Sequence, residues 1–599
     1  MASALSRRAF IKGLAAAQLL AAFSWKLLAT ASTAGANLWR RVRPSDEAWP
    51  SPAEWQKLAD EVGGNLIKVQ PLLAAKDAET NLRNPFYLGD QPAGTQVSGW
   101  LDAWSPAASV YAVDARRTSH VVAAVNFARQ HRLRLVVKGA GHSYQGTSNA
   151  PDSLLVWTRG MNDVTLHDAF IPRGCEAQMT STPAATAGAG AVWIDMYHAV
   201  TSQGGRYVQG GGCADVGVAG LIQSGGFGSM SKGFGTAAAN LLEAEVVTAD
   251  GVARTVNACS DPDLFWALQG GGGGSWGVVT RVTVRTHELP EHFGGAGGKI
   301  QAASDDAFRR LIARFFDFYA ENLLNSHWGE QVALGSDNTL KISMVCQGLT
   351  SDEAKSVWQP FFDWVVAAGP EYTFTGKHGA GARIARDWWN VDGNSSMIPD
   401  RRPNVPSYHG WWKGDQDQVG AFLYGYDSLW LPAALLRAEN RPRLVDALYA
   451  SSRHKDVELH FNKGLAGAAE AAVAATRRTA TNPAVCEAFA LVIIADGEGP
   501  AFPGLARKPI DVDAAHRIAA QIDHAAAELR KVVPDAGSYV SESNYFNAGW
   551  QRAFWGDNYA RLKAIKAKYD PDGLFFVHHG VGSEDWSADG FTRRADGQG

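Results

Sequence analysis

The chain has 599 residues, of which 46% are hydrophobic and 19% are charged, and its formal net charge is −4. This composition supplies a large core and predicts two to four domains. It argues against a nucleic-acid partner, since such proteins concentrate basic residues on one surface. Five cysteines in so long a chain exclude a disulfide scaffold, whereas 63 glycines exceed the usual share of about 7%.

The N-terminus has the pattern of a targeting signal. Arg7 and Arg8 precede an apolar run over 13–28, and small residues follow at 34–36. The pattern resembles a twin-arginine export signal, with a basic amphipathic helix as the alternative. We expect a signal peptide over 1–36, the export machinery as a partner, and a periplasmic or secreted protein. The run is too short to form a stable membrane span.

An N-terminal extension over 37–104 has mixed composition, and α/β texture follows it. Apolar runs predict strands over 109–113, 133–138 and 154–157, with a helix over 119–130 between the first two. More strands are expected over 243–248 and 278–284. Of the 63 glycines, 26 fall between 139 and 290. Because glycine serves where the backbone must approach a ligand, this density predicts a backbone-lined cavity, with a loop-rich structure as the alternative.

A second domain is expected over 291–534. Helices are predicted over 306–319 and 351–366, and a strand over 340–345. This region is rich in tryptophan, which suits either a core or stacking on a sugar or aromatic substrate. The tail holds a predicted helix over 558–568, which the sequence at 570–573 ends. The tryptophans are Trp328, Trp358, Trp364, Trp388, Trp389, Trp411, Trp412 and Trp430.

Two common motifs fail on their context. Residues 272–277 match G-x-G-x-x-G, and Ser275 lies in a G-x-S-x-G, but the β-branched run at 278–284 predicts a strand where both motifs need a helix. No phosphate-binding Walker motif is present. The histidines at 287 and 292 do not form H-E-x-x-H, so we expect no metal site.

Three features suggest chemistry. The turn at 138–144 can present successive backbone N–H groups to an anion, and it contains His142. Cys213 follows three glycines, where little can bury it; it is either a small apolar residue or a thiol that holds a ligand. The third is the block at 569–582, which also fits a helix stop followed by a strand.

Together these features resemble a known family. The matching pieces are 141–143, 212–220, 264–280 and 569–575, and the sequence is similar to the FAD-linked oxidases of the vanillyl-alcohol oxidase fold, in the berberine-bridge-enzyme-like branch. Departures from the family pattern at Ala140 and Ala239 remove no attachment atom.

The resemblance implies an α+β fold. A PCMH-type FAD-binding domain of two α/β subdomains would comprise 105–290 and a C-terminal segment, 535–599. A substrate domain over 291–534 would contain an antiparallel sheet. FAD would be bonded to His142 and Cys213, and other cofactor residues would be Lys138, Gly139, Ala140, Gly141, Ser143, Tyr144, Gly212, Val216, Gly217, Gly220, Gly225, Gly228, Val278, Val279 and Asn544.

The implied reaction is oxidation of a CH–OH group, in an alcohol or sugar, or of an amine. Hydride would pass to flavin N5, and oxygen or another acceptor would reoxidise the flavin. A base must reach the substrate proton, and the candidates are Tyr539, Glu542, Glu458 and His460, each equally suited to a scaffold role. Two alternatives are a serine hydrolase built on Ser275 and a periplasmic carbohydrate-binding protein.

The remaining cysteines are compatible with one disulfide in an exported protein. Their spacing selects no pair among Cys175, Cys259, Cys346 and Cys486.

Overall fold

A computed structural model describes residues 39–594, so the predicted signal peptide lies outside the described residues. The described part of the chain forms three main sheets. None of its helices is both long enough and apolar enough to cross a membrane.

The first sheet has the order β1-β2-β4-β3. Strands β2 (Tyr111–Asp114), β4 (Ser153–Trp157) and β3 (Arg134–Lys138) are parallel, and α5 (Thr118–Gln130) connects β2 to β3. The helix buries apolar residues spaced three and four apart on the face that it turns to this core. Strand β1 (Leu66–Lys68) pairs antiparallel with β2, so the N-terminal extension completes the sheet.

The second sheet is antiparallel, with the order β5-β6-β10-β8-β9 and with β7 paired to β10. Its long central strand β10 (Val278–Glu288) follows the glycine run directly, as the β-branched sequence predicts. The other strands are β5 (Val164–Phe170), β6 (Thr182–Gly188), β7 (Arg206–Val208), β8 (Leu241–Val247) and β9 (Ala253–Asn257).

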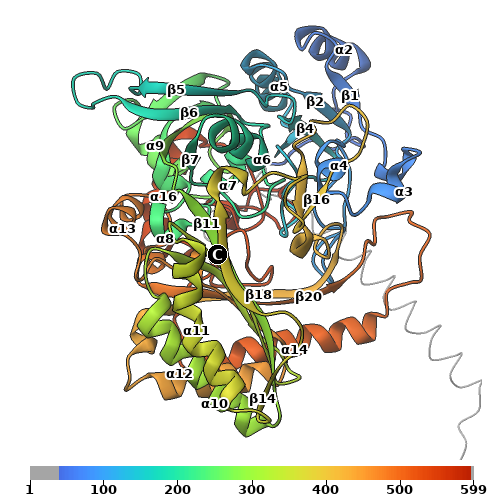
Figure 1. The fold of residues 1–599 in the computed structure, drawn as a ribbon. Coiled ribbons are helices and arrows are strands. Elements are labelled where there is room, and N and C mark those ends of the chain that lie inside the picture. The colour runs from blue at the N-terminus through green and yellow to red at the C-terminus, as the bar shows by residue number, and fades with distance from the viewer. Residues whose placement is uncertain (1–38, 595–599) are drawn as a thin grey trace, which may run out of the picture.

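The third sheet has eight antiparallel strands in the order β14-β11-β13-β12-β19-β20-β18, with β15 paired to β11. Helices α10 (Asp305–Phe318), α11 (Ser351–Ala367), α12 (Arg441–Ser452) and α14 (Val512–Arg530) gather on the side away from the first two sheets (Figure 1). They share one apolar core with the sheet. The strands are β11 (His292–Ala302), β12 (Trp328–Leu334), β13 (Thr339–Gln347), β14 (Tyr372–Phe374), β15 (Gly379–Ile384), β18 (Phe422–Pro432), β19 (Val457–His460) and β20 (Ala488–Glu498).

Shorter elements connect the sheets. A π-helical segment at Tyr197–Gln203 continues α6. The shorter helices and strands are α2 (Pro52–Glu61), α3 (Ala78–Asn81), α4 (Pro85–Gly89), α6 (Trp193–Met196), α7 (Val218–Gln223), α8 (Ser231–Phe234), α9 (Pro262–Leu268), α13 (Glu470–Arg477), α15 (Trp550–Trp555), α16 (Tyr559–Tyr569), β16 (Met397–Pro399) and β17 (Gly410–Trp412).

The α+β fold class is confirmed. The second subdomain of the predicted FAD-binding domain is, however, built on an antiparallel sheet and is not α/β. The C-terminal segment returns to the first sheet, where Phe575 bridges in parallel to Leu135. The third sheet begins at His292, close to the limit expected at 290, and the domain limits themselves remain predictions.

The structure answers two questions that the sequence leaves open, the role of the tryptophans and the pairing of the cysteines. Most of the tryptophans of the second domain are buried in apolar cores, Trp358 and Trp328 most deeply, so they are structural. Cys175 and Cys259 form a disulfide across the second sheet's loops, whereas Cys213, Cys346 and Cys486 are free thiols.

Candidate active site

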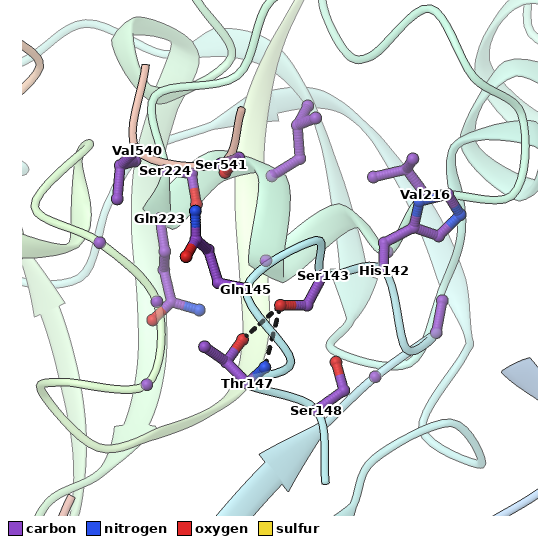
Figure 2. A pocket seen from close by; sticks show the side chains of 18 of the residues that line it. His142, Ser143, Gln145, Thr147, Ser148, Val216, Gln223, Ser224, Val540 and Ser541 are labelled. Carbon is purple, nitrogen blue, oxygen red and sulfur yellow. Dashed lines mark hydrogen bonds between the residues drawn. The ribbon is translucent and has the colours of Figure 1, made fainter. Parts of the chain in front are cut away.

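A cleft is lined by residues from the first two sheets and their connections, by Lys463 beside the third sheet and by the C-terminal segment. Its lining includes five backbone segments, 137–148, 213–224, 272–279, 539–542 and 577–580, which lie far apart in the sequence. Figure 2 shows side chains of the first segment facing Gln223 and Ser224, with Val540 and Ser541 from the C-terminal segment beside them. Residues from the first half of the chain and from the C-terminal segment are therefore both needed to form the cleft.

The loop carrying His142 is anchored at its start by buried hydrogen bonds. It leaves β3 at Lys138, whose buried Nζ donates to the carbonyl oxygens of Gln91, Pro92 and Gly94 at 2.6, 2.7 and 3.0 Å. Gly141 has φ +85°, a conformation that favours glycine, and a Cβ there would approach the Gly94 carbonyl at 3.3 Å. Burial lowers the pKa of Lys138 to about 7.

Two carboxylates accompany the two candidate attachment residues. His142 Nε2 pairs with Asp215, a buried side chain two residues beyond Cys213. The Cys213 thiol lies beside Asp415, which arrives from the segment after β17. Burial raises the pKa of Cys213 well above its usual value, and Asp215 and Asp415 add to that effect. The unattached thiol is therefore protonated at neutral pH.

Asp415 has a perturbed pKa of its own. Burial and the negative charges of Asp215 and Glu330 raise its pKa to about 7, although a hydrogen bond from the Cys213 thiol opposes this. Its Oδ2 atom is buried without a hydrogen-bond partner among the described residues. Such strongly shifted groups concentrate at functional sites.

The wall formed by the third sheet and the C-terminal segment is polar and aromatic. Lys463 Nζ forms an ion pair with Glu542, and both side chains are mostly buried. Tyr539 packs edge-on against Phe227, and Tyr144 stacks on Tyr426 with ring centroids 5.1 Å apart. Burial raises the pKa of all three tyrosines, so each is a neutral phenol at neutral pH.

Most of the predicted site residues line this cleft. The lining includes Lys138, Gly139, Ala140, Gly141, His142, Ser143, Tyr144, Cys213, Val216, Gly217, Gly220, Val279, Tyr539 and Glu542.

The other predicted cofactor residues lie behind the lining. A Cβ on Gly225 would contact Thr481, and one on Gly228 would collide with the Gly210 carbonyl, so both glycines serve close packing. Val278 is fully buried in the core. Gly212 and Asn544 are also absent from the residues that line the cleft.

Glu458 and His460 lie on β19 and pair with each other at 3.4 Å. Neither belongs to the lining of the cleft. The geometry therefore favours Glu542 and Tyr539 over these two, and all four catalytic assignments stay predictions.

Several lining residues are not among those that the sequence predicts. Asp215, Asp415, Gln145, Gln223 and Lys463 line the cleft. Asp215 is only two residues from Cys213, so proximity to that motif was an available signal. Asp415 and Lys463 reach the cleft by tertiary folding alone, and no local pattern marks them.

The hydrolase alternative finds no support in the geometry. Ser275 is buried, its Oγ has no hydrogen-bond partner within residues 39–594, and the chain continues into β10 rather than a helix. A serine nucleophile needs a neighbouring base and an exposed turn.

The lining fits a dinucleotide such as FAD. Much of the cleft wall is glycine-rich backbone of the kind that binds phosphates. A Cβ on Gly220 would meet nothing within 4 Å, so the backbone there faces open space in the cleft. Gln145 Oε1, Gln223 Oε1 and His579 Nδ1 are buried lining atoms that find no partner in the described part of the chain.

Comparison with known proteins decides the family. Residues 110–257 match the model of an FAD binding domain, and 534–582 match the model named berberine and berberine like. The chain is an FAD-linked oxidoreductase of the vanillyl-alcohol oxidase type. It is 29% identical to a VAO-type flavoprotein oxidase from Thermothelomyces thermophilus, over 92% of this chain and 94% of that one.

Solved structures agree with this assignment. The oxidoreductase superposes on a VAO-type flavoprotein from Myceliophthora thermophila C1 with a TM-score of 0.74 and 26% identity, covering 93% of this chain and 100% of that one. A glucooligosaccharide oxidase from Acremonium strictum shares the fold, with a TM-score of 0.61 and 20% identity over 82% and 94% of the two chains. That neighbour is described as carrying a 6-S-cysteinyl, 8α-N1-histidyl FAD.

Proposed function

We propose that this enzyme oxidises an alcohol, sugar or amine substrate at an FAD bonded to both His142 and Cys213. The observation that carries the proposal is that these two residues, on separate glycine-rich loops, line one cleft. The flavin supplies the hydride acceptor, and oxygen or another acceptor takes up the electrons. The attachment described for the Acremonium strictum enzyme uses the same two residue types.

The carboxylates support the two attachments. Asp215 orients the His142 ring through Nε2, which leaves Nδ1 as the nitrogen free to bond. Asp415 lies where it can accept the proton of the Cys213 thiol, since its Oδ2 has no other partner within residues 39–594. Each attachment residue thus has a proton acceptor in place.

Glu542 is the best placed base for the substrate. Its ion pair with Lys463 holds the carboxylate in a largely buried part of the cleft wall. Tyr539 holds its proton because burial raises its pKa, so it can donate a hydrogen bond to a substrate oxygen or nitrogen, whereas the Tyr144 hydroxyl already donates to Gln418 Oε1 at 2.7 Å. A base beside a neutral donor suits removal of a hydroxyl or amine proton.

We also propose export from the cytoplasm. The twin-arginine pattern predicts it, and the disulfide between Cys175 and Cys259 is of a kind that persists in oxidising compartments. Twin-arginine export carries folded proteins, which suits a chain that binds its cofactor first.

Covalent attachment is tested by acid precipitation. We expect a yellow protein whose flavin stays with the polypeptide and fluoresces on a denaturing gel. Cys213→Ala and His142→Ala each leave one bond, seen as a flavin-modified mass, and the double variant releases all its flavin. Cys486→Ala, at a buried thiol elsewhere, is the matched control and keeps both bonds. A wild-type protein that loses its flavin in acid contradicts the proposal.

The acceptor and the substrate class are tested together. A panel of sugars, alcohols and amines is screened for hydrogen peroxide in air and, separately, for reduction of an artificial dye. Peroxide formation identifies an oxidase, and dye reduction alone identifies a dehydrogenase. A flavin that no CH–OH or amine compound reduces contradicts the proposed reaction.

A further inference from the structure

Two segments that lie far apart in the sequence meet in the wall of the flavin cleft. They are the glycine run at 272–277 and the C-terminal loop at 577–580, and both contribute lining residues. A Cβ on Gly274 would lie only 2.6 Å from the Val577 side chain, so the missing side chain allows the two segments to touch. The shape of this part of the cleft therefore depends on how the two segments are held against each other.

The Lys566 side chain, on α16, binds both segments. Its Nζ donates hydrogen bonds to the Ser275 carbonyl at 2.7 Å, to the Phe575 carbonyl at 2.8 Å and to the Asp570 carboxylate at 2.6 Å. An ammonium group has three protons, and these three acceptors use all of them. Lys566 and Ser275 are 291 residues apart, so this bond is made by tertiary folding alone.

The surroundings of Lys566 fix its position. Lys566 is 7% exposed and Asp570 is 2% exposed. The Asp570 carboxylate also accepts the backbone N–H groups of Leu574 at 2.7 Å and Phe575 at 2.9 Å. Arg41 donates to the Leu574 carbonyl from the N-terminal side and lies over the Trp586 ring at 4.2 Å. Hydrogen bonds that involve charged groups are stronger than neutral ones, so this turn is a firm base for the C-terminal loop.

The C-terminal loop and the glycine run both have backbone conformations that need such support. His579 has φ +53°, in the left-handed region that residues other than glycine seldom adopt, and Gly272 and Gly274 have φ +93° and +75°. A non-glycine residue persists in this region when the surrounding structure fixes it. The bonds from Lys566 to the Phe575 and Ser275 carbonyls supply a fixed point next to each segment.

The charges behind this part of the wall favour an anionic ligand. Lys566 and Arg41 are two buried cations, and Asp570 is the carboxylate that interacts with both. Burial lowers the pKa of Arg41 to about 9, so the guanidinium stays charged at neutral pH. The three groups leave one positive charge in excess, which favours an anion in the cleft, and the diphosphate of FAD is anionic.

We propose that Lys566 is a positioning residue for the cofactor, which holds the glycine run against the C-terminal loop in the arrangement that retains FAD. The inference rests on the proposed function, because it concerns the same FAD. Lys566 is not one of the residues that line the cleft. It therefore acts on the cofactor through the two segments that it binds.

The test measures reversible FAD binding in the His142→Ala/Cys213→Ala variant, which lacks both proposed bonds to the flavin. Quenching of flavin fluorescence gives the dissociation constant. In this background Lys566→Met should raise the dissociation constant of FAD at least about tenfold, because both segments lose their charged donor. Lys568→Met is the matched control, since Lys568 lies on the same helix with its side chain 60% exposed, and it should leave the dissociation constant unchanged.

Two further variants separate positioning from general stability. Leu444 is fully buried in the core of the third sheet, so Leu444→Ala should lower the melting temperature and leave the dissociation constant of FAD unchanged. Lys566→Gln keeps hydrogen-bond donors but removes the charge, and its dissociation constant should lie between those of the parent and Lys566→Met. This milder change also keeps the test open if Lys566→Met does not fold.

The outcomes distinguish this inference from the proposed function. Equal FAD affinity in the Lys566 and Lys568 variants overturns the inference. A loss of affinity in Leu444→Ala that equals the loss in Lys566→Met, at the same fall in melting temperature, also overturns it, because the effect is then general destabilisation. In chains that keep His142 and Cys213, the fraction with attached flavin should fall in Lys566→Met and not in Lys568→Met. A parent chain that holds no FAD in either background contradicts the proposed function, and this inference with it.

Discussion

The two walls of the flavin cleft are built on different principles. One wall is backbone, with glycine-rich loops at 139–146 and 217–228 that offer N–H groups and space. The other is made of side chains, with Lys463, Glu542 and Tyr539 reaching in from the third sheet's surroundings and the C-terminal segment. A large cofactor needs shape and close approach, whereas a substrate proton needs a titratable group. We therefore propose that the first wall holds the cofactor and that the second supplies the chemistry.

The largest effect is expected from the support of the backbone wall. Lys138→Met removes the donor that three carbonyls share, at Gln91, Pro92 and Gly94. We expect the free energy of unfolding to fall by about 3 kcal/mol or more, with incomplete flavin attachment, because buried carbonyls lose their partner. Urea unfolding and flavin absorbance measure the two effects.

Lys232→Met is the matched control for this change. Lys232 is an equally buried lysine outside the cleft lining, and it donates to one carbonyl, that of Ala466. We expect a smaller loss of stability and full flavin attachment. Equal flavin loss in both variants shows that the effect is general destabilisation.

The next effect tests the side-chain wall. Glu542→Gln removes the charge that Lys463 holds and should lower kcat/KM about 100-fold while flavin attachment stays complete, because a base is lost but the backbone wall is intact. Steady-state kinetics and the denaturing gel report the two quantities. Glu458→Gln, at a carboxylate outside the lining, is the control and should change kcat/KM little. The reverse pattern moves the base to β19.

The contrast between the two walls also explains which parts of the fold the sequence predicts and which it does not. Strands β3 and β4, helix α5 and the His142 loop follow from local signals, namely apolar periodicity and clustered glycines. Their contacts lie close in sequence. The π-helical continuation of α6 and the extra strand β1 have no comparable local signature, because tertiary packing decides them.

The side-chain wall was harder to predict for the same reason. Asp415 and Lys463 meet Cys213 and Glu542 across more than 70 residues of sequence, and a charged residue in isolation looks like any surface residue. Glycine also has two uses that the sequence does not separate. Gly220 faces the cleft, whereas Gly228 packs against the Gly210 backbone.

A third prediction concerns Asp415, which lines the cleft, and how the free energy of unfolding depends on pH. Folding raises the pKa of Asp415 from 3.8 to about 7, so the folded state favours the protonated carboxyl. The stabilisation is present below about pH 4 and is lost as the pH rises through about 7. The side chain of Asp415→Asn cannot ionise, so the free energy of unfolding of this variant should fall less between these pH values than that of the wild type. The expected difference between the two falls is roughly 1–3 kcal/mol. Parallel urea titrations of both proteins measure the difference, and coincident pH profiles contradict it.

The smallest effect on stability is expected at Gly220, where the backbone wall leaves open space. Gly220 lies inside α7 with open space beside it, so Gly220→Ala meets no atom of the chain. Alanine favours a helix over glycine, and the variant without flavin should be up to about 1 kcal/mol more stable than the wild type prepared in the same way. The added methyl group nevertheless enters the space assigned to the cofactor, so the fraction of chains with bound flavin should fall. Thermal unfolding and the ratio of flavin to protein absorbance measure the two. Full flavin occupancy in this variant shows that the cofactor does not approach α7, and the assignment of this wall to the cofactor is then wrong at that point.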